Sequence, residues 1–304
     1  MQSTSLKTLN HEYSVINYLG DGNTSNVYKV RLENSPNFYA AKIFYSNEEF
    51  SNEINIYNKI NGLPYIINCI DSGNGPSIEE NSSSQNTDFL ILEYASHRSL
   101  YDYIQNEKGL SEDTCKILLY DILKGVSALH ERGICHKDIK PDNILLCGDN
   151  YQSKLIDFGY SESFLDENNQ KIKLEKYYGT KGYYAPELYM LMPFDGEKAD
   201  IFSLGATLFC LLTGKTIFDI TKYPDDLYKL IIEKHIKKFW KKVKKIIDVE
   251  LSRSFMKLFV KMVCFDPEER LSLYEIRNSE WMQGVENLDR TKMINELKLI
   301  EEKL

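Results

Sequence analysis

The hydrophobic pattern changes its period near Ala95, and this change constrains the fold more than any other feature of the chain. From Tyr13 to Phe44, short runs of β-forming residues are separated by two turn-like sequences, 20–23 and 34–37. After Ala95, apolar residues recur at helical spacing, as in Leu118, Ile122, Val126 and Leu129. Ser111 is the expected N-cap of that helix. We therefore predict an α+β chain with a β-rich first region and a mainly helical second region.

One helix and two further strands are predicted inside the β-rich region. Residues 46–49 have the composition of a helix start, and four apolar residues follow at helical spacing: Phe50, Ile54, Tyr57 and Ile60. Two more β-type runs, 66–70 and 89–94, flank a stretch rich in Gly, Ser and Asn. This stretch, 72–87, is predicted to be a mobile loop.

The composition excludes several classes of protein. With 42% hydrophobic and 27% charged residues in 304, the chain is expected to be globular rather than disordered or fibrous. Its net charge of −8 disfavours a basic surface for nucleic acid, so no nucleic-acid partner is expected.

Cysteine usage and hydropathy indicate a reducing compartment. The six cysteines form no Cys-x-x-Cys pair, which fits neither a disulfide framework nor a structural zinc site. Residues 1–10 lack the apolar run of a signal peptide, and the apolar stretch 201–212 is far shorter than the roughly 20 residues of a membrane-spanning helix. We expect a cytoplasmic protein without a membrane segment, with the nucleus as an alternative, and a buried helix at 201–212.

Two segments have amphipathic helical patterns. Residues 231–247 contain seven lysines between apolar residues, which predicts a lysine-rich helix over 234–247. Near the C-terminus, four apolar residues share one helical stripe: Met293, Leu297, Ile300 and Leu304. This segment could dock on the body of the chain or on a partner. A regulatory partner could therefore bind through 284–304 or through the lysine-rich helix. The alternative for the lysine-rich helix is an ordinary face exposed to solvent.

Three motifs in a fixed order carry the chemistry. The sequence His136-Lys137-Asp138-Ile139-Lys140-Pro141-Asp142-Asn143 is followed by Asp157-Phe158-Gly159 and later by Ala185-Pro186-Glu187. Over residues 11–283 the chain resembles the eukaryotic protein kinase superfamily. The resemblance implies a bilobal fold, with an antiparallel β-rich N-lobe and a mainly helical C-lobe that clasp ATP. It implies an N-terminal extension 1–12, a kinase domain 13–283 (N-lobe about 13–93, hinge 93–97, C-lobe 98–283) and a C-terminal helical extension 284–304.

The resemblance places the nucleotide against the N-lobe. Lys42 follows two alanines in a β-type run and is expected to bind the α and β phosphates. The glycine-rich pattern departs from the family at Ser25, which replaces the third glycine. Glu53 is expected to pair with Lys42, with Glu49 as the alternative. The remaining nucleotide contacts are expected at Leu19, Gly20, Asp21, Gly22, Val27, Ala40, the gatekeeper Leu92, the backbone of Glu93 and Ala95, and Leu145.

The resemblance also assigns the transfer chemistry. Asp138 is expected to accept the proton of the substrate hydroxyl, while Asn143 and Asp157 hold Mg²⁺ through hard oxygen ligands. Lys140, two residues after the base, and Thr180 match the serine/threonine kinases, in which this lysine neutralises the transferring phosphate. ATP and Mg²⁺ are the implied cofactors, and the partners are protein substrates with Ser or Thr acceptors.

Three further residues are expected to brace the site. Asp200, just before the apolar run, is interpreted as an N-cap, and the family adds a role in holding the catalytic loop. Glu187 and Arg270 match a buried ion pair of the family.

Two departures from the family concern the need for phosphorylation of the loop after Asp157-Phe158-Gly159. Lys137 stands where many kinases carry an arginine that binds a loop phosphate, and a lysine cannot reproduce that planar fork. Residues 164–179 contain no Ser or Thr. We therefore predict activity without activating Ser/Thr phosphorylation of the loop.

Two other functions are alternatives to this one. The first is a pseudokinase scaffold that binds nucleotide and partners without phosphoryl transfer, which the intact Lys42, Asp138, Asn143 and Asp157 disfavour. The second is a kinase-fold enzyme acting on a lipid or small molecule, which residues 180–187 disfavour because the matching segment shapes a peptide groove in the family. Ser99 stands near the place where kinases that prefer upstream arginine often carry Glu, so no strong preference for basic motifs is expected.

Overall fold

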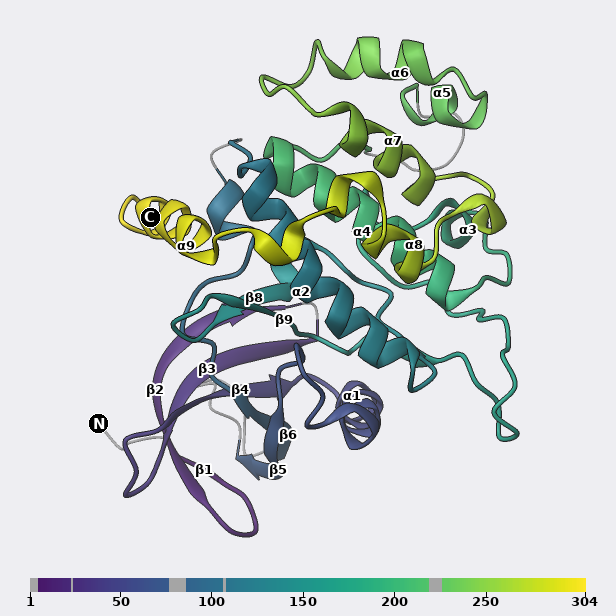
Figure 1. Ribbon diagram of the computed structural model, residues 1–304. Helices are drawn as coiled ribbons and strands as arrows, with labels where there is room; N and C mark the ends of the chain where they lie inside the picture. The colour runs from purple at the N-terminus through teal and green to yellow at the C-terminus, as the bar shows by residue number, and fades with distance from the viewer. Residues whose placement is uncertain (1–4, 23, 77–85, 106–107, 219–225) are drawn as a thin grey trace. The chain divides into compact units, whose positions relative to one another are not determined.

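The computed structural model describes residues 5–22, 24–76, 86–105, 108–218 and 226–304. These divide into two compact units (Figure 1). Unit 1 comprises residues up to Ser96 together with Asp157–Gly159, and unit 2 comprises His97–Ile156 and Tyr160–Leu304.

Unit 1 is built on a six-stranded antiparallel sheet. The strands are β1 (Ser5–Lys7), β2 (Glu12–Asp21), β3 (Ser25–Leu32), β4 (Phe38–Phe44), β5 (Cys69–Pro76) and β6 (Asn86–Glu93), in the spatial order β1-β2-β3-β4-β6-β5. Residues 5–7 of the predicted N-terminal extension therefore form a strand, which pairs with β2. The predicted loop 72–87 is wrong at both ends, because 72–76 and 86–87 continue β5 and β6 through backbone pairing. Residues 77–85 of that loop lie outside the described residues.

The two faces of this sheet differ. One face is apolar and buried, formed by a cluster that includes Val30, Ala41, Ile43, Phe89 and Ile91. Because side chains alternate along a strand, residues 40 and 42 of β4 lie on the opposite face. The register places Val27 beside Lys42 and Leu92 beside Ala40 on that opposite face.

The helix α1 (Asn47–Ile60) begins where the sequence predicts. The Ser46 side chain accepts the backbone N–H of Glu49, which satisfies one of the unpaired amides of the first turn. Its buried side chains are Glu53, Ile56, Tyr57 and Ile60, so a glutamate lies in an otherwise apolar stripe.

Unit 2 is mainly helical. Its helices are α2 (Glu112–His130), α3 (Pro186–Tyr189), α4 (Gly196–Thr213), α5 (Tyr228–Ile232), α6 (Ile236–Val243), α7 (Arg253–Met262), α8 (Leu273–Arg277) and α9 (Arg290–Glu301). Short 3-10 turns lie at η1 (Asp102–Ile104), η2 (Pro141–Asn143), η3 (Pro267–Glu269), η4 (Glu280–Met282) and η5 (Val285–Asn287). Two small antiparallel pairs complete it, β7 (Ile134–Cys135) with β10 (Glu162–Ser163) and β8 (Ile144–Cys147) with β9 (Gln152–Leu155).

The centre of unit 2 is the helix α4, which confirms the predicted buried helix at 201–212. Nearly all of its residues are buried, and its Phe209 ring lies 5.3 Å from Phe259 of α7. The predicted cap of α2 is also present, since Ser111 accepts the backbone N–H of Thr114. Among the described residues, none of the helices combines the length and hydropathy needed to cross a bilayer.

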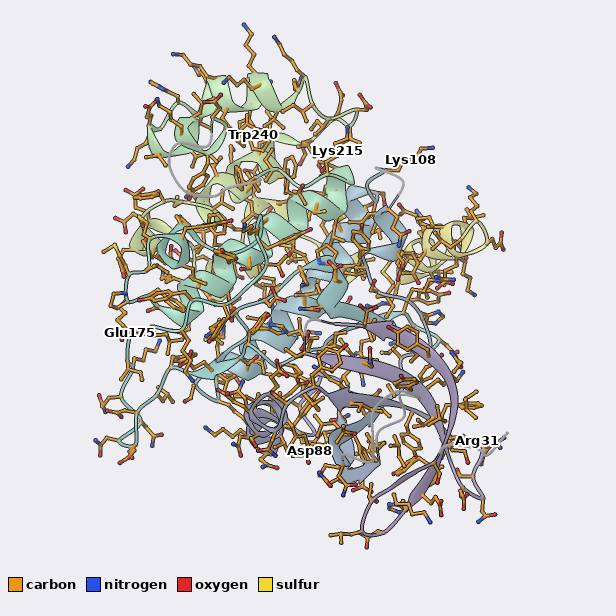
Figure 2. All side chains as sticks on the ribbon, turned by 180° about the vertical axis from the view of Figure 1, so that it is seen from behind. Arg31, Asp88, Lys108, Glu175, Lys215 and Trp240 are labelled. Atoms are coloured by element: carbon orange, nitrogen blue, oxygen red, sulfur yellow. The ribbon has the colours of Figure 1, made fainter. Side chains whose placement is uncertain are left out.

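The lysine-rich helix is shorter than predicted. The pattern over 231–247 is interrupted after α5, where Lys234 takes a left-handed backbone with φ of 55°. The second helix, α6, covers only Ile236–Val243. Trp240 lies on its inner side against Phe255 and Phe259 of α7, while long nitrogen-tipped side chains project outward from the same helix (Figure 2).

The C-terminal segment docks on its own unit. Met293 and Leu297 of α9 are fully buried, and the helix packs on α2 and on η1. The stripe predicted there is confirmed in part, because Leu304 is 42% exposed.

Candidate active site

In unit 1, the polar centre forms around Lys42. Its side chain is buried, and its Nζ lies 2.6 Å from Glu53 Oε2 and 2.8 Å from Asp157 Oδ1. Two carboxylates thus compensate an ammonium that would be costly to bury alone. Burial alone would lower the pKa of Lys42, but Asp157 and Glu53 outweigh it and raise this pKa, so the ammonium stays charged.

Glu53 rather than Glu49 is the partner of Lys42. Glu49 is only partly buried and accepts a hydrogen bond from Ser46 at the start of α1, whereas Glu53 is fully buried. Burial raises the pKa of Glu53 to about 7, and the Lys42 ammonium opposes that rise. The helix α1 begins only five residues after Lys42, so only eleven residues separate Lys42 from Glu53 in the sequence.

The segment Asp157–Gly159 is fixed against α1. The Phe158 ring is buried and meets Tyr57 edge to face at 5.3 Å. Asn52 Nδ2 donates to the Gly159 carbonyl at 2.6 Å. Asp157 itself takes a left-handed backbone with φ of 62°, and its side chain is 43% exposed. One carboxylate therefore contacts Lys42 and is also accessible from solvent.

The other predicted nucleotide residues of unit 1 differ in their exposure to solvent. Leu19 and Asp21 are exposed, Leu92 is buried, and the rest are partly buried except the exposed Gly22. Gly20 and Gly22 have ordinary backbone angles, and a Cβ added at Gly20 would meet no atom within 4 Å. The fold alone therefore does not require glycine at residue 20, which is consistent with close approach of a ligand.

In unit 2, the second polar centre forms around Asp138. The Thr180 hydroxyl donates to Asp138 Oδ1 at 2.6 Å, and Asn143 Nδ2 donates to Asp138 Oδ2 at 2.9 Å. Lys140 Nζ lies 3.0 Å from Asp138 Oδ2 and 2.7 Å from the Thr180 oxygen. The predicted residues of this loop are thus brought together, and the Asp138 carboxylate already accepts from a threonine hydroxyl.

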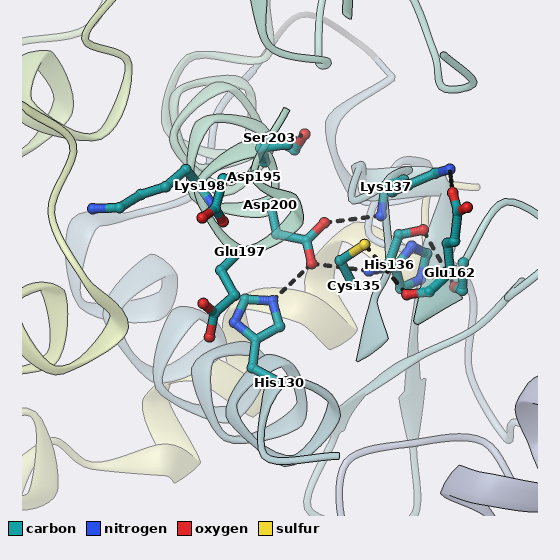
Figure 3. Close-up of polar contacts among 12 residues, drawn as sticks. His130, Cys135, His136, Lys137, Glu162, Asp195, Glu197, Lys198, Asp200 and Ser203 are labelled. Atoms are coloured by element: carbon teal, nitrogen blue, oxygen red, sulfur yellow. Dashed lines mark hydrogen bonds and ion pairs between the residues drawn. The ribbon is translucent and has the colours of Figure 1, made fainter. Parts of the chain in front are cut away.

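Asp200 binds the backbone of the loop that carries Asp138. The Asp200 carboxylate accepts the backbone N–H groups of His136 at 2.9 Å and Lys137 at 2.8 Å, and it also bonds His130 Nε2 at 2.8 Å (Figure 3). The predicted N-cap role of Asp200 is wrong, because α4 begins earlier and Asp195 caps it by accepting from Lys198 N. The role implied by the family, holding the catalytic loop, is the one the structure shows.

The activation segment, which we define as residues 157–187, is braced at both ends. Arg270 donates twice to Glu187, at 2.6 and 2.7 Å, which confirms the predicted buried pair. At the other end, Lys137 Nζ donates to Glu162 Oε2 at 2.7 Å (Figure 3). It also donates to the Lys176 carbonyl at 3.0 Å. Sequence reasoning missed Glu162, although an acid shortly after Asp157-Phe158-Gly159 was a visible partner for the unusual Lys137.

A second cluster missed by sequence reasoning lies on α9. Glu301 accepts hydrogen bonds from the hydroxyls of Tyr103 and Tyr151, and His97 Nδ1 lies 3.1 Å from it. The rings of His97 and Tyr151 stack at 3.7 Å, and His97 is the first residue of unit 2. Glu296 adds contacts to the start of α2, where it accepts from Ser111 and Thr114.

Comparison with known proteins finds similarity to protein kinases. A family model described as the protein kinase domain matches residues 13–282. A probable serine/threonine-protein kinase of Dictyostelium discoideum is 30% identical over 266 residues, covering 86% of this chain and 30% of that protein. The serine/threonine-protein kinase cds1 of Schizosaccharomyces pombe is 30% identical over 302 residues, covering 93% and 61%. The serine/threonine-protein kinase SRK2I of Arabidopsis thaliana is 35% identical over 195 residues, covering 63% and 51%. The chain thus spans between 30 and 61% of the length of these relatives.

Proposed function

Because the chain belongs to the protein kinase family, we propose that it is an active, magnesium-dependent serine/threonine kinase that transfers the γ-phosphate of ATP to protein hydroxyls. One observation carries this proposal: the Asp138 carboxylate accepts a hydrogen bond from the Thr180 hydroxyl beside the Lys140 ammonium. A hydroxyl, a carboxylate and a cation are thus already assembled in the arrangement that an acceptor Ser or Thr needs.

The acceptor chemistry rests on Asp138. Its carboxylate accepts the proton as the acceptor O–H bond breaks, a new O–P bond forms, and the bond to the departing ADP breaks. Asn143 and Lys140 hold Asp138 Oδ2, which orients Oδ1 toward the hydroxyl. Lys140 also supplies positive charge next to that hydroxyl, where the transferring phosphoryl group carries negative charge.

The nucleotide chemistry rests on Lys42. Its raised pKa keeps it charged at neutral pH, as binding of the α and β phosphates requires. Val27, Ala40 and Leu92 give the same face of the sheet an apolar surface suited to adenine. In the same unit, the backbone of Glu93 and Ala95 is proposed to bind the adenine edge, and Leu145 of unit 2 is proposed as a further apolar contact of the nucleotide.

Asn143 and Asp157 have the donors that Mg²⁺ prefers. Asn143 uses its amide nitrogen on Asp138, which leaves its carbonyl oxygen for a cation, and the Asp157 carboxylate is accessible. Such hard oxygen ligands suit Mg²⁺, which shares its remaining coordination with phosphates and water. When bound, the ion would neutralise the phosphate charge that develops during transfer.

We further propose that the activation segment needs no activating phosphate. The buried Lys137 ammonium already has a carboxylate and a carbonyl as partners, and the Tyr178 and Phe194 rings lie within 6 Å of it. A phosphate would have to displace Glu162 from this lysine. The negative charge that phosphorylation supplies in other proteins is thus present in the unmodified chain.

The test is phosphate transfer from radiolabelled ATP with Mg²⁺ to generic protein substrates, followed by phosphoamino-acid analysis. Wild type is compared with Asp138→Asn and Asp157→Ala, each checked for folding by circular dichroism. Label on Ser or Thr that is lost in both variants supports the proposal. Nucleotide binding in a thermal-shift assay, without transfer under any of these conditions, would instead favour the pseudokinase scaffold. Transfer to lipid or small-molecule acceptors without label on protein would favour a kinase-fold enzyme that acts on a lipid or small molecule.

A further inference from the structure

The outward side of α6 and its C-terminal flank carries an uninterrupted positive surface. We define the α6 lysine face as Lys237, Lys238, Lys241, Lys242, Lys244 and Lys245, all of which are exposed. Residues 234–247 contain no acidic residue. None of these six lysines has an ion-pair partner in the part of the chain that the structure describes, although the whole chain has a net charge of −8.

This arrangement works against the stability of the helix. Lys237 and Lys241, and likewise Lys238 and Lys242, are four residues apart on one helical surface, where like charges repel. Lys234, just before α6, shows the contrast because it is paired with Glu269 at 2.9 Å. No carboxylate among the described residues pairs with these six lysines, so an external anion would relieve their mutual repulsion.

The face is presented on a fixed support. Phe239 and Val243 are fully buried, and the ring centroids of Trp240 and Phe259 of α7 lie 5.6 Å apart. Beyond the end of α6, Lys215 Nζ donates to the Ile246 carbonyl at 3.1 Å and holds the chain that follows. The lysines therefore project from a preorganised element, so binding to them does not first require the helix to fold.

We propose that the α6 lysine face binds an acidic, Asp/Glu-rich segment of a protein partner. Lysines four apart on a helix are spaced by about 6 Å along its axis, close to the ~7 Å between alternate side chains of an extended chain. An extended acidic segment lying along α6 can therefore place a carboxylate near each successive lysine. This binding is independent of whether the protein transfers phosphate.

The residue types favour this occupant over other anions. Residues 231–247 contain no arginine, whose planar fork is the better group for recognising a single phosphate. Lysines act as separate point charges and suit negative charge that is spread along a segment. The apolar side of α6 is already buried on α7, which leaves it unable to insert into a membrane. Outside the face, the net negative charge of the chain would repel long nucleic acid.

The test measures binding of a fluorescein-labelled 16-residue peptide, four repeats of Glu-Glu-Asp-Ser, by fluorescence anisotropy. Reversal of four lysines (Lys237→Glu, Lys238→Glu, Lys241→Glu and Lys242→Glu) is expected to weaken binding at least ~10-fold. Raising the salt concentration from about 50 to about 300 mM is expected to weaken binding to the wild type as well, since exposed charges are screened.

Two matched variants act as controls. Arginine at the same four positions keeps the charge and is expected to keep the affinity within roughly 3-fold. Glutamate at four exposed lysines elsewhere (Lys59, Lys292, Lys298 and Lys303) makes the same change of net charge and is expected to leave most of the binding. Thermal unfolding and circular dichroism check that each protein is folded.

The proposal is overturned by any of three results. The first is no peptide binding by the wild type at low salt. The second is equal binding by the charge-reversed protein, or an equal loss of binding in the variant with glutamate at the four exposed lysines elsewhere. The third is tighter binding of a DNA duplex of matched charge, or of phosphatidylserine vesicles, than of the peptide, because either would assign the face to another class of partner.

Discussion

Lys137 Nζ donates to Glu162 Oε2 at 2.7 Å, and the two side chains come from the loop of Asp138 and from the strand that follows Asp157–Gly159. The ion pair therefore ties the catalytic loop to the start of the activation segment. Removing one partner leaves a charged lysine buried, which is far less favourable than losing an exposed pair.

The first prediction concerns this pair. Glu162→Gln is expected to lower kcat about 10-fold or more, because breaking a buried charge pair costs about 3 kcal/mol and the loop loses its brace. Treatment of the wild type with a phosphatase is expected to leave its activity unchanged. Both are measured as initial rates of peptide phosphorylation, with mass spectrometry to verify that the loop is unmodified. Inert phosphatase-treated protein that recovers on loop phosphorylation would show that Glu162 does not replace a phosphate.

The second prediction concerns Thr180. Its hydroxyl joins Asp138 and Lys140, so Thr180→Val, which keeps the shape and removes the hydroxyl, is expected to lower kcat about 10- to 100-fold. Thr180→Ser restores the hydroxyl and is expected to keep most of the activity. Steady-state kinetics with a peptide acceptor measure both variants. Equal rates in the valine and serine variants would remove Thr180 from the proposed machinery.

The third prediction concerns pH. Burial raises the pKa of Glu53 to about 7, so the carboxylate that pairs with Lys42 is charged above that pH and becomes protonated below it. Activity is therefore expected to fall as the pH drops through about 7, because the Lys42–Glu53 pair weakens. Initial rates between pH 5.5 and about 8.5 measure this. The Glu53→Gln variant, which has no group to titrate there, is expected to show a lower rate that varies little over the same range.

The fourth prediction concerns Glu301. Burial alone would raise its pKa, but hydrogen bonds from Tyr103 and Tyr151 and the charge of His97 outweigh burial, so the pKa of Glu301 lies below 4.5. Glu301→Gln is expected to lower the free energy of unfolding by about 1–3 kcal/mol at pH 7. Because the folded-state pKa is the lower one, this difference is present above pH 4.5 and disappears as the pH falls through the folded-state pKa.

Urea denaturation measures the Glu301 effect, provided that both proteins unfold in one transition. Glu302→Gln is the matched control, because it removes the same charge from the neighbouring exposed residue. Equal destabilisation by the two changes would mean that the contacts of Glu301 contribute nothing specific.

Local signals in the sequence predicted local structure well. Residues 46–49 were recognisable as a helix start and Ser111 as a helix cap, because each precedes an apolar helical stripe, and Ser46 and Ser111 are N-caps in the structure. The same reasoning failed at Asp200, because Asp195, five residues earlier, begins the helix instead. The break at Lys234 was also hidden, since hydrophobic spacing continues across a single residue with positive φ.

Contacts between distant residues could be predicted only where a motif linked them. The pairs Lys42–Glu53 and Glu187–Arg270 were expected because the family resemblance connects their positions, and the structure shows both. Glu301 meets Tyr103 and Tyr151, which precede it by 198 and 150 residues, and no motif connects these residues. Such contacts depend on where α9 packs, which single-sequence periodicity does not specify.

The position of α9 means that the limit of the family is not the limit of the folding unit. The family match ends at residue 282, yet Met293 and Leu297 beyond it are fully buried. A protein truncated at residue 282 would uncover the surfaces of α2 and η1 that α9 covers, and it would leave the His97–Tyr151 stack without its carboxylate. The segment after residue 282 is therefore a structural part of unit 2 rather than an appendage to it.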